Sequence, residues 1–126
     1  MKRTVLSIED TPGIRRLIRM TLEYDGFEVI EAADGHEGLE LARSKRPDLI
    51  LMDVRMPGMS GVEACKKLSA DADLSKIPVV MLTTADADGD MQTGLDAGAR
   101  AYLTKPFQPI ALIELVHALI DDARQH

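Results

Sequence analysis

Short apolar runs alternate with helix-like segments from one end of this chain of 126 residues to the other. Most of the runs lack polar positions, which is typical of strands buried on both faces. Between them, apolar residues recur at helical spacing. This alternation predicts one α/β domain over residues 1–126, with a parallel sheet covered by helices on both faces. The predicted strands are Val5–Ile8, Phe27–Ala32, Leu49–Met52, Val79–Leu82 and Arg100–Thr104.

Helix start signals lie between these runs. Thr11 precedes Pro12, which suits the first position of a helix, and the apolar spacing predicts a helix over 12–24. Asp34 and Ser60 each stand three residues before a glutamate, which is the capping-box pattern. The segment before the last strand is the weakest helix, because glycines interrupt it and each interior Gly costs about 1 kcal/mol relative to Ala.

The composition fits a packed domain and excludes several classes of protein. The net charge of -6 disfavours direct binding of nucleic acid, and an aromatic content of 3% disfavours a base-stacking platform. The single cysteine, Cys65, excludes an intrachain disulfide and is interpreted as a packed helix residue. The scattered histidines suggest no zinc site. No run is long enough for a signal peptide or membrane span, so we expect a soluble protein, cytoplasmic in a bacterium-like cell.

Chemically useful side chains follow four of the predicted strands. The carboxyl ends of parallel strands meet at one edge of the sheet, where open α/β folds bind ligands. Carboxylates, a hydroxyl and an ammonium at such an edge suit a divalent cation together with a phosphoryl group. In chain order, these residues are Glu9, Asp10, Asp53, Thr83 and Lys105.

Each of the acids permits two interpretations. Asp53 is either a nucleophile that accepts a phosphoryl group or a strand-ending aspartate that caps the next turn. Glu9 and Asp10 are either part of a Mg2+ site, since a cation relieves the repulsion among nearby carboxylates, or the polar lead-in to the first helix.

Lys105 and Thr83 each permit two interpretations as well. Lys105 is either a point-charge partner for a phosphoryl oxygen or a surface lysine before a turn, and a cis bond to Pro106 is expected to aim it inward. Thr83 either donates its hydroxyl to the same group or is an ordinary β-branched strand residue. Each residue alone is a weak signal, whereas suitable chemistry after four separate strands is a strong one.

Taken together, these residues resemble the receiver domains of response regulators, the family that includes the chemotaxis response regulators. The resemblance covers about Val5 to Ile120. It implies a flavodoxin-like five-stranded sheet of order 2-1-3-4-5. The matching motifs are Glu9-Asp10, Asp53 with Met56-Pro57 and Gly61, Thr83, Ala97-Gly98-Ala99, Tyr102 and Lys105-Pro106-Phe107.

The resemblance implies a role for each site residue. Asp53 would be the phosphoacceptor. Mg2+ would be held by Asp10 and Asp53, by Glu9 through a water, and by the backbone carbonyl of Arg55. Lys105 would pair with the phosphoryl group. The chain would not be an enzyme beyond its own phosphorylation and dephosphorylation.

The resemblance also implies partners and a conformational switch. The phosphoryl donor would be a phosphohistidine on a sensor histidine kinase or a phosphotransfer protein. Thr83 would then move toward the phosphoryl oxygens and Tyr102 would change rotamer. These movements would alter the surface of the last strand and the last two helices, which a downstream target protein would bind. We expect the segment Gly89–Gly94, which has low intrinsic helicity, to be a two-state element.

Two departures from the family pattern and one further residue bear on how the site works. Glu9 stands where the family often has Asp, which should keep metal binding. Thr84 stands where a smaller residue, often Ala, is usual, and its bulk would crowd the attacking water. Arg55 could reach over the phosphoryl group. We therefore expect a slowly hydrolysed phosphoryl state.

Other functions match part of the pattern. A phosphatase of the haloacid dehalogenase type also uses an Asp nucleophile and Mg2+, but its second Asp would stand where this chain has Arg55. A binding module with an inactive site is disfavoured because all the key residues are present. Within the receiver interpretation, the chain is either a stand-alone regulator, which the lack of a linker after the last helix favours, or the receiver of a larger protein.

Overall fold

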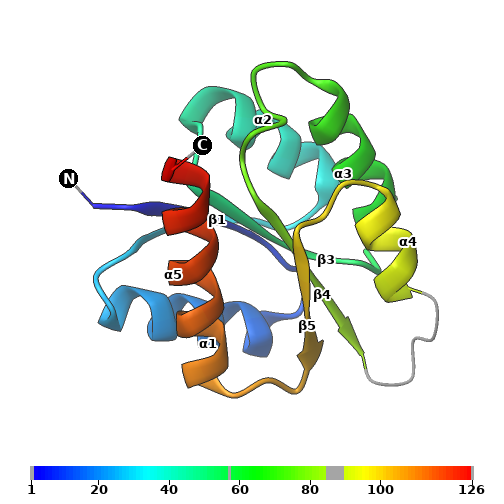
Figure 1. Cartoon of the computed structure of the whole chain (residues 1–126). Coiled ribbons are helices and arrows are strands. Elements are labelled where there is room, and N and C mark those ends of the chain that lie inside the picture. Colours follow the sequence, from blue (N-terminus) through cyan, green and yellow to red (C-terminus); the bar gives the residue numbers. More distant parts are fainter. Residues whose placement is uncertain (1, 57, 85–89, 126) are drawn as a thin grey trace.

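A computed structural model describes residues 2–56, 58–84 and 90–125, in which strands and helices alternate along the chain (Figure 1). The strands are β1 (Thr4–Ile8), β2 (Glu28–Ala32), β3 (Leu49–Asp53), β4 (Val79–Thr84) and β5 (Ala101–Lys105). The helices are α1 (Pro12–Tyr24), α2 (Gly35–Lys45), α3 (Gly61–Ala70), α4 (Asp90–Asp96) and α5 (Pro109–Gln125). The predictions for Pro57, Gly89 and His126 lie outside the described residues.

The strands form one parallel sheet of order β2-β1-β3-β4-β5. This confirms the flavodoxin-like order. Every residue of the central strand β3 is buried, which explains why its sequence shows no alternation of apolar and polar positions.

Helices cover both faces of the sheet, and each face has its own core (Figure 1). α1 and α5 pack on one face, whereas α2, α3 and the chain after α4 pack on the other. Because successive side chains of a strand point to opposite faces, β3 sends Leu49 and Leu51 to the first core and Ile50 and Met52 to the second. Cys65 is fully buried in α3, as predicted.

The strands that carry the candidate site extend further than predicted. Asp53, Thr83 and Lys105 belong to β3, β4 and β5 rather than following them. The parallel pairing continues to these residues, since Asp53 pairs with Leu82 and Thr84 pairs with Lys105. The side chains therefore project from paired backbone, which holds them more firmly than a loop would.

The helices that follow Thr11, Asp34 and Ser60 begin where they were predicted, with one difference in capping. The side chains of Asp34 and Ser60 each accept a hydrogen bond from the backbone N–H three residues later, at 2.9 and 3.1 Å. Thr11 stands at the N-cap of α1, but its side chain makes no capping hydrogen bond. The first turn of α1 begins with Pro12, which has no N–H to be capped. None of the helices in the described part of the chain is both long and apolar enough to cross a membrane.

Candidate functional site

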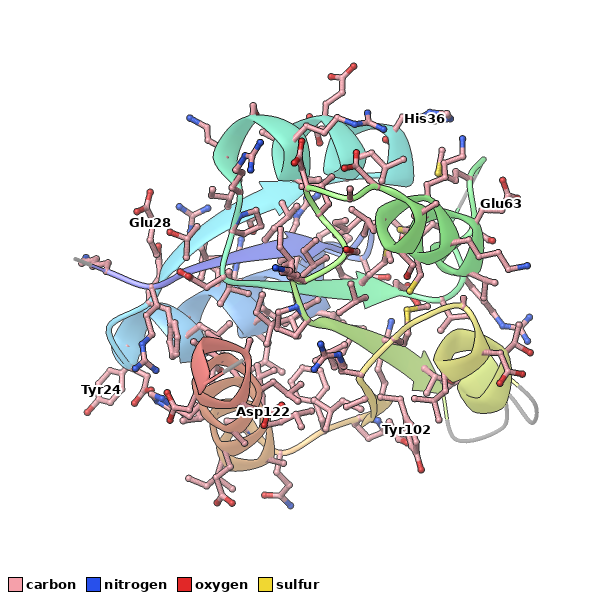
Figure 2. The ribbon with its side chains drawn as sticks, turned by 45° about the horizontal axis from the view of Figure 1, so that its top comes forward. Tyr24, Glu28, His36, Glu63, Tyr102 and Asp122 are labelled. Atoms are coloured by element: carbon pink, nitrogen blue, oxygen red, sulfur yellow. The ribbon has the colours of Figure 1, made fainter. Side chains whose placement is uncertain are left out.

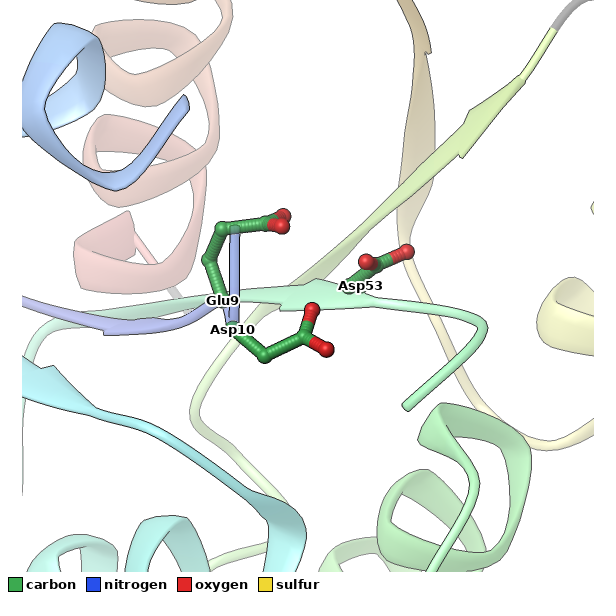
Figure 3. Close-up of side chains that lie close together, drawn as sticks. All are labelled: Glu9, Asp10 and Asp53. Atoms are coloured by element: carbon green, nitrogen blue, oxygen red, sulfur yellow. The ribbon is translucent and has the colours of Figure 1, made fainter. Parts of the chain in front are cut away.

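Three carboxylates from two neighbouring strands converge at the carboxyl edge of the sheet (Figure 3). Glu9 and Asp10 follow β1 directly, and Asp53 is the last residue of β3. Because β1 and β3 pair in parallel, their carboxyl ends lie side by side. One carboxylate oxygen from each residue lies within 4.8 Å of the other two. The structure therefore brings together the three acids that the sequence predicted as a cation site.

Two of these acids are taken out of water. Glu9 is 0% exposed and Asp53 is 8% exposed, whereas Asp10 is partly exposed. Burial raises the pKa of Glu9, and the negative charge of Asp53 raises it further, although Lys105 and the backbone N–H of Thr11 act in the opposite direction. A site of this kind favours the binding of a positive charge, because a cation offsets both the burial and the repulsion.

Lys105 supplies the ammonium that the sequence predicted. Its Nζ lies 3.2 Å from Oε2 of Glu9 and 3.2 Å from Oδ2 of Asp53. The Lys105 side chain is 11% exposed, and the bond to Pro106 is cis, as predicted. The Lys105 ammonium by itself does not neutralise the three carboxylates.

Backbone groups orient the buried carboxylates. The N–H of Thr11 donates to Oε1 of Glu9 at 3.2 Å, and the N–H of Arg55 donates to Oδ1 of Asp53 at 3.2 Å. Gly61 closes the turn that follows β3, and its N–H donates to the carbonyl of Val54 at 2.9 Å. A Cβ atom at Gly61 would overlap the backbone carbonyl of Asp53. The chain therefore needs glycine at this position to fold back against the site.

Thr83 lies near this edge, and its hydroxyl bonds within its own strand instead of to the acids. Its side chain is 3% exposed, and its hydroxyl donates to the backbone carbonyl of Thr84 at 3.3 Å. In this conformation the hydroxyl therefore bonds to the backbone of its own strand. A role at the acid cluster requires Thr83 to change its hydrogen-bond partner.

The donor set fits Mg2+. This cation prefers oxygen ligands, is bound by a small number of carboxylates, and keeps several waters. Glu9, Asp10 and Asp53 offer carboxylate oxygens close together, and the residual negative charge would be neutralised. The set contains neither cysteine nor histidine, which zinc usually takes as ligands.

Comparison with known proteins agrees with this geometry. A family model described as the response regulator receiver domain matches residues 5–117. The chain belongs to this family. It is therefore a receiver domain of the two-component response regulators, as the motifs around Asp53 and Lys105 predicted.

The relatives of this receiver domain differ in length. It is 39% identical over 116 residues to protein PilH of Pseudomonas aeruginosa. The matched residues make up 92% of this chain and 96% of PilH. Other matched relatives, several of them named DNA-binding response regulators, are longer, and the chain spans about half of their length.

Solved structures share the receiver fold. The chemotaxis response regulator CheY4 of Vibrio cholerae has a TM-score of 0.88 and 36% identity, over 94% of this chain and 99% of CheY4. The receiver domain of the sensor histidine kinase PA1611 of Pseudomonas aeruginosa has a TM-score of 0.89 and 31% identity, over 96% and 99% of the two chains. That structure has a magnesium ion coordinated in its active site cleft.

Proposed function

We propose that Asp53 accepts a phosphoryl group from a phosphohistidine of a sensor histidine kinase or phosphotransfer protein. One observation carries the proposal: Lys105 Nζ lies 3.2 Å from Asp53 within a group of three converging carboxylates. Asp53 is the last residue of β3, at the carboxyl edge of the sheet. The N–H of Arg55 fixes its Oδ1 and Lys105 fixes its Oδ2, so the carboxylate is held in one position for the reaction.

The transfer is a displacement at phosphorus. An oxygen of Asp53 attacks the phosphorus atom, the bond from phosphorus to the donor imidazole nitrogen breaks, and the electron pair of that bond returns to the imidazole. Asp10, Asp53, the backbone carbonyl of Arg55 and, through a water, Glu9 would hold Mg2+. The cation, when bound, supplies charge neutralisation at the phosphoryl oxygens. Lys105 exchanges its contact with Asp53 for one with a phosphoryl oxygen, which stabilises the product.

The switch follows from a new hydrogen-bond partner for Thr83. In the proposal, its hydroxyl leaves the carbonyl of Thr84 and donates to a phosphoryl oxygen. Tyr102 is 42% exposed on β5, where its side chain points outward (Figure 2), and it has room to change rotamer. The surface formed by α4, β5 and α5 would then differ between the two states, and a target protein that prefers one of them would shift the population.

Incubation with acetyl phosphate and Mg2+ tests the function. We expect a single phosphoryl adduct by intact-protein mass spectrometry, located on Asp53 and lost in Asp53→Asn. Removal of Mg2+ with a chelator should prevent its formation. Steady turnover of organic phosphates without a stable adduct would favour a phosphatase, and neither adduct nor turnover would favour an inactive binding module.

The lifetime of the adduct is a further part of the proposal. Thr84 is exposed and lines a cavity of about 500 Å3 together with Thr11 and Lys105, next to the acid cluster. Its side chain therefore occupies a route by which water could approach the phosphoryl group. We expect Thr84→Ala to lose the phosphoryl group faster than the wild type. A wild type that dephosphorylates faster than Thr84→Ala would contradict this.

We propose a stand-alone regulator that binds a target protein after phosphorylation. The near-complete coverage of PilH supports this form. The longer relatives, which are named as DNA-binding or transcriptional regulators, support the alternative, a receiver joined to an output domain. Sequencing the native gene beyond the codon of His126 separates the two. A cytoplasmic location stays a prediction.

A further inference from the structure

A hydrogen bond from another helix holds the C-terminal end of α4. Ser69, in the last turn of α3, donates its Oγ hydroxyl to the backbone carbonyl of Ala97 at a distance of 3.0 Å. The two residues are 28 positions apart in the sequence. Ala97 is 5% exposed, so a lost donor would not be replaced by bulk water without local opening.

The turn after α4 explains why this carbonyl needs a donor. The N–H of Gly98 donates to the carbonyl of Leu95 at 3.0 Å, and the N–H of Ala99 donates to the carbonyl of Gly94 at 3.1 Å. These are the two bonds of a Schellman motif, and Gly98 has the expected positive φ of 115°. They satisfy earlier carbonyls of the helix and leave the carbonyl of Ala97 to a side chain.

The two helices approach each other closely at this point. A Cβ atom at Gly98 would overlap Oγ of Ser69. The residue after Ala97 therefore has to be glycine for two reasons, its backbone conformation and the position of Ser69. The contact is specific to this pair of side chain and backbone rather than a loose surface contact.

β4 connects α4 to the acid cluster. A Cβ atom at Gly94 would lie 3.1 Å from Cγ of Met81, so α4 packs directly on this strand. Thr83 stands two residues beyond Met81 and therefore on the same face of β4. Thr83 and the packing surface for α4 therefore lie on one face of the same strand, whereas Ser69 holds the C-terminal end of α4 to α3.

We propose that Ser69 is a positioning residue that keeps α4 in its resting arrangement and so raises the free energy of switching. This inference rests on the proposed function, because the switched state exists only if Asp53 is phosphorylated. A contact that is made in the resting state and weakened in the switched state opposes the switch. Its effect equals the difference between the free energies that the contact contributes in the two states. Ser69 touches neither the acids nor the phosphoryl group and acts through α4.

Ser69→Ala tests this in two measurements. Amide hydrogen exchange at residues 97–99 should become about fivefold faster, the factor expected for one hydrogen bond worth about 1 kcal/mol. The free energy of unfolding in urea should fall by no more than the same ~1 kcal/mol, and exchange in Leu49–Asp53 should accelerate by no more than the same factor. Phosphorylation of Asp53 by acetyl phosphate with Mg2+ should become faster, by up to about fivefold if the switched state lacks the bond.

Two variants serve as controls. Ser75→Ala removes a hydroxyl that bonds only within its own turn, to the carbonyl of Ala72 at 3.5 Å, and should change neither measurement. Ser69→Thr keeps the hydroxyl and should restore both values toward those of the wild type.

The outcomes separate this inference from the proposed function. If the wild type is phosphorylated on Asp53 but Ser69→Ala leaves exchange at residues 97–99 unchanged, the inference is wrong. Faster exchange with an unchanged phosphorylation rate also overturns it, since Ser69 would then cap α4 without affecting the switch. A wild type that forms no adduct overturns both proposals.

Discussion

The two edges of the sheet use charged side chains in opposite ways. Near the amino edge, charged and polar side chains are matched in pairs: Nε2 of His117 lies 2.6 Å from Oδ2 of Asp25, and Nη1 of Arg3 lies 3.1 Å from Oδ1 of Asp121. At the carboxyl edge, three carboxylates face the single ammonium of Lys105. The first arrangement is complete in the folded chain, whereas the second is the one that we propose a cation and a phosphoryl group complete.

The two edges differ in how far their charged side chains are buried, and this difference separates a weakly stabilising edge from the edge that carries the candidate site. The pairs near the amino edge are substantially exposed, with 43% for His117 and 31% for Asp25, and exposed pairs contribute little. Glu9 and Asp53 are buried, so their charges interact strongly and at a cost. Local rules of charge pairing are thus broken where the domain has to bind something.

Gly61→Ala should have the largest effect on stability. The new Cβ would overlap the carbonyl of Asp53, so the turn after β3 has to move, and we expect a loss of about 3 kcal/mol in urea unfolding. Gly13→Ala is the matched control, because a Cβ there meets nothing within 4 Å. Equal stabilities for the two variants would contradict the close approach at Gly61.

Asp10→Asn should weaken Mg2+ binding at least about tenfold, or about 1.4 kcal/mol, in calorimetric titration. The variant removes one of the three converging carboxylates without disturbing a buried side chain. Asp25→Asn removes an acid near the amino edge and should leave Mg2+ binding unchanged. An equal loss of Mg2+ affinity in both variants would mean that Mg2+ does not bind specifically at the carboxyl edge.

Glu9→Gln should stabilise the Mg2+-free domain by about 1 kcal/mol near neutral pH, because it removes a buried charge. The pKa of Glu9 is raised in the folded state from its usual 4.5. Well below pH 4.5 the carboxyl is protonated in both states and has no effect; above it, the unfolded chain ionises first and stability falls. The gain in the free energy of unfolding of Glu9→Gln over the wild type, measured in urea, should therefore be larger at pH 7 than at pH 4.

The smallest effect should come from His117→Gln, near the amino edge. The variant removes the contacts of His117 with Asp25 and with the ring of Phe27, whose centroid lies 5.1 Å away. We expect a loss of about 0.5 kcal/mol in urea unfolding, because the pair is partly exposed to water. A loss as large as that of Gly61→Ala would show that this edge also carries essential interactions.

The sequence predicted the fold and the acid cluster because both follow from short-range patterns. Buried apolar runs mark the strands, and parallel strands bring Glu9, Asp10 and Asp53 to one edge. The order of the strands came from the resemblance to receiver domains. The cis bond before Pro106 was also predicted correctly.

Other contacts depend on the packing of distant segments, which no local pattern encodes. His117 and Asp25 are 92 residues apart, and Ser69 meets Ala97 only because α3 and α4 pack side by side. The direction of the Thr83 hydroxyl likewise depends on rotamer choice in the folded strand.

The sheet also has a consequence for how such a chain can vary. Its two hydrophobic clusters have no side chain in common, because the sheet lies between them. Replacements beneath α1 and α5 can therefore be compensated by neighbours in that layer alone, without any adjustment beneath α2 and α3. The residues of each cluster can therefore change independently of the other cluster, while the acids at the carboxyl edge of the sheet stay the same.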